Sequence, residues 1–172
     1  MRLFQVSEES DIHIFKPREP TRADLNKSIK MVWAINEKRL VNFLTPRDCP
    51  RVTFFASDTS TKEDVEKYIG RSEVDAVLAI EQVWFERMLN TTLYIYEFDP
   101  TNFILQDEIA GYYISTKVEV PVGITRIDNL FSVLFERNVE VRILPSLWHL
   151  HDNIKSSSLG FSMCRMRNAL PR

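Results

Sequence analysis

The chain has 172 residues, of which 44% are hydrophobic and 27% charged, the size and balance of one soluble domain. A formal net charge of -2 excludes the strong positive excess that bulk binding to nucleic acid or an anionic membrane needs. No apolar run approaches the ~20 residues of a membrane span, and the first residues lack a secretory-signal layout. We therefore expect a single domain over residues 1–172, no membrane partner, and a cytoplasmic location with reduced thiols.

In the first half of the chain, short β-rich runs alternate with polar segments of helical periodicity. The pattern predicts a mobile loop over residues 16–29, where prolines interrupt a mostly polar stretch. Asn36 is predicted to cap a short helix over 37–44, and Ser60 with Glu63 to form a capping box for a helix that Gly70 ends. A further helix is predicted over 82–89. The predicted strands or extended pieces are 2–7, 12–15, 31–35, 51–56 and 74–80.

The second half continues the same mixture. Strands are predicted over 92–98, 112–115, 117–122 and 139–144. Asp128 is predicted to cap a helix over 129–137, and one long helix should run from Leu147 toward Ala169. Seven or so strands with four or five helices, in no strict βαβ rhythm, favour an α+β fold with mixed, mainly antiparallel sheets and flanking helices.

Several chemical motifs are excluded. The chain has only four glycines, too scattered for a P-loop or a dinucleotide fingerprint, because both need several glycines close together. The two cysteines lie far apart and neither belongs to a CxxC pair. Cys49 lies between Arg47 and Arg51, whose charge could lower its pKa and make it reactive. The alternative is a small, partly buried thiol.

The paired imidazoles His149 and His151, followed by Asp152, are the clustered metal-ligand candidates. On a strand, residues two apart share a face, whereas on a helix they point about 200° apart and do not easily share one ion. We interpret this segment as helical, which favours solvent-facing histidines over a zinc site.

Arginine usage is more informative, because 14 of the 22 basic residues are arginine. The rigid guanidinium fork suits carboxylates and phosphates in partly buried settings. Arg18, Arg47 and Arg51 lie in proline-bounded loops or at strand ends, from which they could converge on one cleft. The alternative is that they form surface ion pairs with the 24 acidic residues, each worth little.

Tyrosines at 94, 96, 112 and 113 fall on two strand-like segments, which would expose alternating phenols. A phenol ring can stack on a nucleobase or nicotinamide while its hydroxyl makes a hydrogen bond. Ordinary cross-strand packing is the alternative.

Several segments together resemble a family of small bacterial proteins that has no assigned activity. They are MRLFQVSEESDIHIFKPR, VWAINEKRLVNFLTPRDCPRVTF, LYIYEFDP, GYYIS with VEVPVGITRIDNL, and VEVRILPSLWHLHDNIKSSSLGFSMCRMRNAL. The resemblance runs from end to end. In that family the first strand usually has histidine where this chain has Gln5.

More distantly, the layout is similar to the ADP-ribosyltransferase-like fold, which includes toxins and RNA 2'-phosphotransferase-type enzymes. In that fold an early strand supplies a histidine or arginine, a middle strand an aromatic residue or serine, and a late strand a glutamate, which together grip nicotinamide and ribose. The resemblance implies that Gln5 takes the first of these positions, Tyr113 or Ser115 the second, and Glu119 the third. It also implies NAD or a phosphorylated relative as ligand, with Arg18 and other arginines holding the phosphates. The alternative for Glu119 is an exposed strand glutamate beside Lys117.

Two functional hypotheses follow. In the first, the protein binds a nucleotide-like ligand. Such a protein would be a degenerate or atypical ADP-ribosyl- or phosphotransferase, with Gln5 and Glu119 at the reacting centre. Its ligand-binding residues would be Arg18, Arg47, Arg51, Tyr113 and Ser115. The second is a non-catalytic module that binds a protein partner or its own copy. The residues alone do not decide whether the chain is an enzyme.

Overall fold

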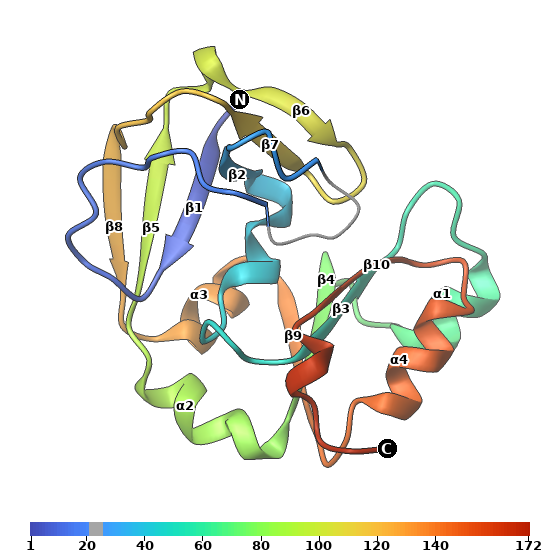
Figure 1. Ribbon diagram of the computed structural model, residues 1–172. Helices are drawn as coiled ribbons and strands as arrows, with labels where there is room; N and C mark the ends of the chain where they lie inside the picture. Colours follow the sequence, from blue (N-terminus) through green and yellow to red (C-terminus); the bar gives the residue numbers. More distant parts are fainter. Residues whose placement is uncertain (21–25) are drawn as a thin grey trace. The chain divides into compact units, whose positions relative to one another are not determined.

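The structure is a computed structural model and describes residues 1–20 and 26–172. Within that part of the chain, it confirms the α+β class, with one six-stranded and one four-stranded sheet (Figure 1). The chain divides into two compact units, unit 1 (Met1–Leu40 and Thr92–Ile127) and unit 2 (Val41–Thr91 and Asp128–Arg172). Because the chain passes between them three times, neither unit is a contiguous segment. The single domain over residues 1–172 stays a prediction.

Unit 1 is built on an antiparallel sheet with the strand order β6-β7-β2-β1-β5-β8. Each strand runs antiparallel to its neighbours. The strands are β1 (Leu3–Ser7), β2 (Val32–Asn36), β5 (Leu93–Phe98), β6 (Ile104–Asp107), β7 (Tyr112–Ser115) and β8 (Gly123–Ile127), and a 3-10 helix, η3 (Pro100–Asn102), precedes β6.

Unit 2 contains a mixed sheet with the strand order β10-β3-β4-β9, in which β4 and β9 are parallel and the other pairs antiparallel. Its strands are β3 (Arg51–Phe55), β4 (Ala76–Glu81), β9 (Val139–Leu144) and β10 (Gly160–Cys164). Its helices are α1 (Lys62–Tyr68), α2 (Phe85–Asn90), α3 (Leu130–Glu136) and α4 (Trp148–Lys155), with 3-10 turns η2 (Gln82–Trp84) and η4 (Met166–Asn168).

One hydrophobic core cluster of unit 1 lies on one face of its sheet. Phe15, from the segment before the loop, sets its ring edge-on against Tyr96 (5.1 Å between centroids) and Phe98 (5.0 Å). Edge-to-face pairs of this kind stabilise beyond the area they bury. The buried members of this core are Leu3, Phe15, Val32, Ala34, Tyr96, Phe98 and Phe103.

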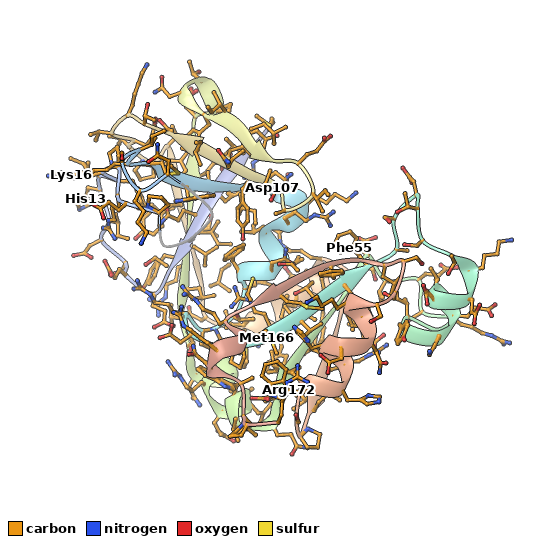
Figure 2. The ribbon with its side chains drawn as sticks, turned by 45° about the vertical axis from the view of Figure 1, so that its right-hand side comes forward. His13, Lys16, Phe55, Asp107, Met166 and Arg172 are labelled. Atoms are coloured by element: carbon orange, nitrogen blue, oxygen red, sulfur yellow. The ribbon has the colours of Figure 1, made fainter. Side chains whose placement is uncertain are left out.

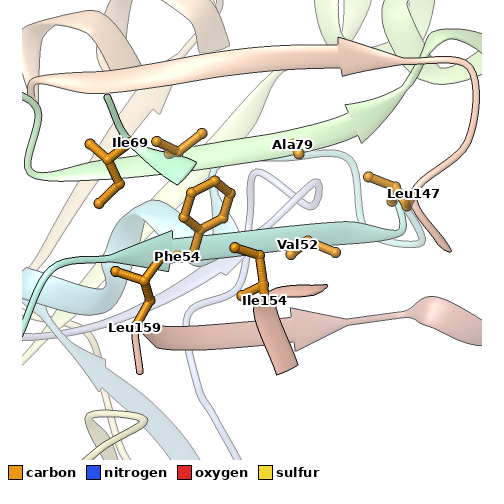
Figure 3. Packing of buried hydrophobic residues seen from close by; sticks show 8 residues of the cluster. Val52, Phe54, Ile69, Ala79, Leu147, Ile154 and Leu159 are labelled. Carbon is orange, nitrogen blue, oxygen red and sulfur yellow. The ribbon is translucent and has the colours of Figure 1, made fainter. Parts of the chain in front are cut away.

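The core of unit 2 forms where α1 and α4 meet the sheet (Figure 3). Phe54 on β3 lies at its centre and is fully buried. The alternation of β3 places Val52 and Phe54 on this face, because successive strand residues point to opposite faces. The buried members are Val52, Phe54, Ile69, Val77, Ala79, Leu147, Ile154 and Leu159.

A 3-10 helix, η1 (Glu37–Phe43), follows β2, where the sequence predicts a short helix over 37–44. Asn36 caps it as expected, since its side-chain oxygen accepts a hydrogen bond from the Arg39 N–H (3.0 Å). The Asn36 N–H in turn donates to the carbonyl of Gly111 (3.0 Å). Gly111 has φ of +68° and no room for a Cβ, which would meet the Asn36 and Arg39 side chains at 2.7 Å.

Two predicted helix caps are each wrong by one residue. Thr61, rather than Ser60, caps α1 by accepting the Asp64 N–H, and Asn129, rather than Asp128, caps α3 by accepting the Ser132 N–H. Both pairs of neighbours are good capping residues, so local preference does not choose between them. Near α1 the contacts with Ser158 decide, because its hydroxyl accepts the Thr61 N–H at 2.8 Å.

The single long helix predicted from residue 147 onward is wrong. α4 ends at Lys155, where Ser156 and Ser157 turn their hydroxyls onto the carbonyls four and three residues back (3.0 and 2.8 Å). Such bonds compete with continuation of a helix. The chain then forms β10, with Gly160 opposite Phe55 of β3. A Cβ at Gly160 would collide with the Phe55 ring, so a residue without a side chain is required there.

Three extended segments also differ from expectation. β6 and β8 lie where the sequence predicts no strand, because most of their side chains are exposed and give no alternation. The predicted strand over 117–122 is instead a single bridge between Glu119 and Phe15. The predicted extended piece over 12–15 likewise pairs only at Phe15. Part of the loop predicted over 16–29, residues 21–25, lies outside the described residues.

Candidate functional site

The register of unit 1 gathers several predicted site residues on one face of its sheet. Leu3 is opposite Asn36, and Val32 is opposite Ser115. Directly opposed residues share a face, and so do residues two apart on one strand. Gln5, Tyr113 and Ser115 therefore lie on the face that carries the core of unit 1. Gln5 and Tyr113 are half-buried, and Ser115 is buried.

Glu119 lies over this face and is buried, with only 6% of its surface exposed. The expected alternative of an exposed strand glutamate is wrong, because the backbone pairing of Glu119 with Phe15 (2.8 and 2.9 Å) turns its side chain inward. The flanking Val118 and Val120 point outward and are exposed. The carboxylate accepts a hydrogen bond from the Ser115 hydroxyl at 2.5 Å. A buried charge needs such partners, since desolvating it alone is expensive.

Ser115 joins this carboxylate to the backbone of the following turn. Its hydroxyl oxygen accepts a hydrogen bond from the Lys117 N–H (3.1 Å), while the hydroxyl itself donates a hydrogen bond to the Glu119 carboxylate. Lys117 points elsewhere and donates to the side-chain oxygen of Asn102 (3.0 Å). The lysine is therefore engaged with a neutral group, and Ser115 fixes the position of the carboxylate.

The tyrosines divide between packing and the candidate site. Tyr96 is fully buried, and its hydroxyl donates to the Glu9 carbonyl (2.6 Å) and accepts the Ile12 N–H (3.2 Å). It therefore anchors the segment that follows β1. Tyr112 lies on the opposite face from Tyr113, with its ring 5.5 Å from that of Trp33. Tyr113 shares a face with Gln5 and Ser115, and so do Tyr94 and the fully buried Tyr96 of β5.

β1 has β2 and β5 as its neighbours, and Glu119 pairs with Phe15 rather than with β1. Gln5 and Glu119 therefore belong to one face without belonging to adjacent strands. Arg18 forms a bridge with Met31, whose side chain alternates with that of Val32. This pairing assigns the exposed Arg18 to the face opposite Gln5.

Arg51 and Arg47 belong to unit 2. Arg51 is buried, and its guanidinium donates to the carbonyls of Asn42 (2.5 Å) and Cys49 (2.9 Å) and lies over the Phe43 ring (5.3 Å). These contacts make it a link between the loop before β3 and the strand itself. Arg47 is exposed in that loop. Arg47 and Arg51 therefore belong to a different unit from Gln5, Tyr113, Ser115 and Glu119.

Cys49 is a fully buried thiol, so of the two interpretations the buried thiol is the correct one and a pKa lowered by the flanking arginines is wrong. Burial raises the pKa to about 12, against smaller opposing effects of Arg51 and Arg87. Desolvation outweighs the positive charge because the thiolate would lie in a poorly polarisable interior. The thiol donates to the Pro50 carbonyl (3.5 Å). Cys49 is therefore a packing residue rather than a nucleophile.

Cys49 gives a prediction for alkaline pH. Its folded pKa of about 12 exceeds the ordinary thiol value of 9.0, so the unfolded chain ionises first as pH rises. The associated stability is present below pH 9 and is lost between pH 9 and about 12. We expect Cys49→Ala to make the free energy of unfolding fall less steeply across this window, measured by urea denaturation at several pH values. An unchanged slope, with Cys164→Ala as the matched control, would contradict the assignment.

The histidine segment lies on α4, as predicted. The His149 ring contacts the Asn153 amide (3.1 Å), and the His151 ring contacts the Asp152 carboxylate (2.9 Å). Each imidazole thus has a different partner. Among residues 1–20 and 26–172 there is no group of three or more histidine, cysteine or acidic side chains arranged to hold a metal ion.

Sequence reasoning missed Glu81, the last residue of β4. It is fully buried, and its carboxylate accepts backbone N–H groups from Leu147 and Leu170. The available signal was an acidic residue at the end of the continuous apolar run that forms β4. A charge in that position is unusual unless specific donors surround it.

Comparison with known proteins gives a family for this chain. The model of a family described as "Family of unknown function (DUF6886)" matches residues 4–169. The chain belongs to this family. Searches of the curated proteins and of the solved structures each found no match. None of the helices in the described part of the chain is both long enough and apolar enough to span a bilayer.

Proposed function

We propose that unit 1 binds a nucleotide-like ligand, NAD or a phosphorylated relative, at the face that carries Gln5, Tyr113, Ser115 and Glu119. The observation that carries the proposal is the buried Glu119 carboxylate, fixed by the Ser115 hydroxyl at 2.5 Å on the same face as Gln5 and Tyr113. Burial of a carboxylate costs free energy, and charged groups kept in such places mark functional sites more often than exposed ones do.

The three side chains supply complementary chemistry. The Tyr113 ring can stack on a base or nicotinamide, the Gln5 amide can donate and accept hydrogen bonds, and Glu119 can stabilise positive charge on a ribose. In a transferase reaction the nicotinamide–ribose bond breaks, nicotinamide leaves with the electron pair, and an acceptor hydroxyl attacks the ribose carbon and loses its proton. Because an amide cannot shuttle protons at neutral pH as a histidine can, Gln5 supports an atypical or degenerate transferase.

The test is calorimetric titration with NAD, ADP-ribose and a short RNA that ends in a phosphate. We expect binding that Glu119→Gln and Tyr113→Phe each weaken about tenfold, the loss of roughly one hydrogen bond to a charged or polar partner. The matched controls are Tyr112→Phe, on the opposite face of the same strand, and Glu108→Gln, an exposed glutamate of unit 1. Both should bind as the wild type does.

Absence of heat with all three ligands at millimolar concentration would overturn this proposal. The alternative, a module that binds protein or its own copy, would then be favoured by the exposed Val118, Val120 and Val122 that lead into the edge strand β8. Light scattering on the same sample separates the two outcomes, because a stable dimer supports the alternative.

We also propose that the protein works in the cytoplasm. Both cysteines, Cys49 and Cys164, are free thiols rather than a disulfide. Free thiols persist in reducing compartments.

A further inference from the structure

The C-terminal residues of unit 2 contact the end of β4 through a buried carboxylate. Glu81 has no exposed surface and accepts the N–H of Leu170 on both of its oxygens (3.2 and 3.1 Å). It also accepts the N–H of Leu147, just before α4, at 3.4 Å. Glu81 thus links the end of β4 to the residue before α4 and to the C-terminal segment.

Trp148, the first residue of α4, holds the other polar backbone group of Leu170. Its indole N–H donates to the Leu170 carbonyl at 2.6 Å. The N–H and the carbonyl of one residue are therefore both bound by side chains instead of by a neighbouring strand. The next residue, Pro171, has no N–H and needs no acceptor. Recognition of this kind depends on the extended backbone and tolerates most side chains at Leu170.

Arg172 adds contacts that do depend on the side chain. Its guanidinium donates to both oxygens of Asp152 (2.7 and 3.1 Å) and lies over the Trp148 ring at 4.3 Å from the centroid. Figure 2 labels this residue and Met166, at the start of the turn that precedes it. A two-pronged pair with a carboxylate, combined with an aromatic face, suits arginine better than lysine.

The site is therefore organised like a receptor for a short peptide. Its side chains come from β4 and α4, and the residues they hold come from a segment after the last turn, η4. An empty site would leave the buried Glu81 carboxylate without the Leu170 donor. Since unsatisfied buried charged groups are costly, an emptied site has a strong tendency to bind a replacement.

We propose that Glu81, Trp148 and Asp152 form a peptide-binding site for an extended Xaa-Pro-Arg segment, that residues 170–172 occupy it within the chain, and that the same segment of a second copy can replace them. Each copy carries both the site and the segment, so reciprocal exchange gives a symmetric pair in which every contact described above is remade. This inference concerns unit 2 and does not depend on the ligand proposed for unit 1.

The test uses the full chain with the double substitution Leu170→Pro and Arg172→Ala. Proline removes the N–H that Glu81 accepts, and alanine removes the guanidinium, so the site should be vacated. The probe is the peptide acetyl-Ala-Leu-Pro-Arg-amide, titrated by calorimetry while the Trp148 indole N–H is followed by NMR. We expect the double variant to bind the peptide at least tenfold more tightly than the wild type, whose site is already occupied.

Two controls make the result specific. Leu170→Ala keeps the backbone groups and Arg172, so it should bind the added peptide as weakly as the wild type. The peptide acetyl-Ala-Leu-Pro-Ala-amide should bind the double variant at least tenfold more weakly than the arginine peptide, about the loss of one charge-assisted interaction. Adding Asp152→Asn to the double variant should reduce this preference for arginine, leaving only the contribution of the Trp148 ring.

Failure of the folded double variant to bind the arginine peptide, or equal binding of both peptides, would overturn the proposal. Folding is checked by circular dichroism and thermal unfolding. If the double variant does not fold, Arg172→Ala alone replaces it, because that side chain is 60% exposed, and the same comparison of peptides decides.

For exchange between copies, light scattering of the wild type at rising concentration should show dimers that the double variant does not form. A wild type that stays monomeric at millimolar concentration would overturn that part.

Discussion

Arg51→Met is expected to lower the free energy of unfolding by about 3 kcal/mol, because two buried carbonyls lose their donor. The guanidinium donates to Asn42 and Cys49 and lies over Phe43, all in the loop and helix that lead to β3. Methionine has a similar length but cannot donate, so it fills space without satisfying those groups. Urea denaturation followed by circular dichroism measures the change.

Arg47→Met is the matched control for this substitution. Arg47 is exposed in the same loop, so its loss should change the free energy of unfolding much less, by about 0.5 kcal/mol. Equal effects at the two positions would show that Arg51 does not hold the loop. Ligand titrations on both variants add a second measurement. If Arg51 contacts the ligand, its loss should weaken binding even in the folded fraction of the variant.

Phe54→Ala is expected to cost about 3–5 kcal/mol, the range for deletion of a fully buried aromatic ring. Phe54 has no exposed surface, and its neighbours come from β3, β4, α1 and α4. Deleting the ring leaves a cavity that strand backbones on both sides prevent from closing. Thermal and urea unfolding should both register the loss, with a clear fall in the melting temperature.

Phe135→Ala supplies the control within the same unit. Phe135 is on α3 and 60% exposed, so its removal should cost well under 1 kcal/mol. A similar cost at Phe54 would mean that the cluster around β3 is not the core of unit 2. Because the chain forms two compact units, probes from both should be followed, with Trp33 reporting on unit 1 and Trp148 on unit 2.

The Leu170–Glu81 contact and the Ser115–Glu119 pair have a common physical feature. In each, a buried carboxylate accepts hydrogen bonds from a residue that is far away in the sequence or across a turn. A buried carboxylate is stable only where donors are fixed in advance by the surrounding strands. This is why both positions carry the proposals made above.

The strands with clear signals in the sequence were predicted well. β1, β5 and β9 alternate apolar and polar residues, and β4 is a continuous apolar run, so their positions follow from side-chain periodicity alone. The α+β class follows from the mixture of such runs with short helical segments. The absence of glycine-rich phosphate loops and of paired cysteines also follows from the sequence alone.

The tertiary structure decided which polar residues are buried and what they contact. The sequence around Glu119, Arg51 and Cys49 gives no sign that these residues are buried. In the structure, a backbone bridge to Phe15 turns Glu119 inward, and burial raises the pKa of Cys49. The segment after α4 became a strand because β3 offered an edge and Gly160 fits against Phe55. Periodicity reports only the local alternation of a chain, whereas burial depends on distant segments that cover each residue, so these outcomes required the folded structure.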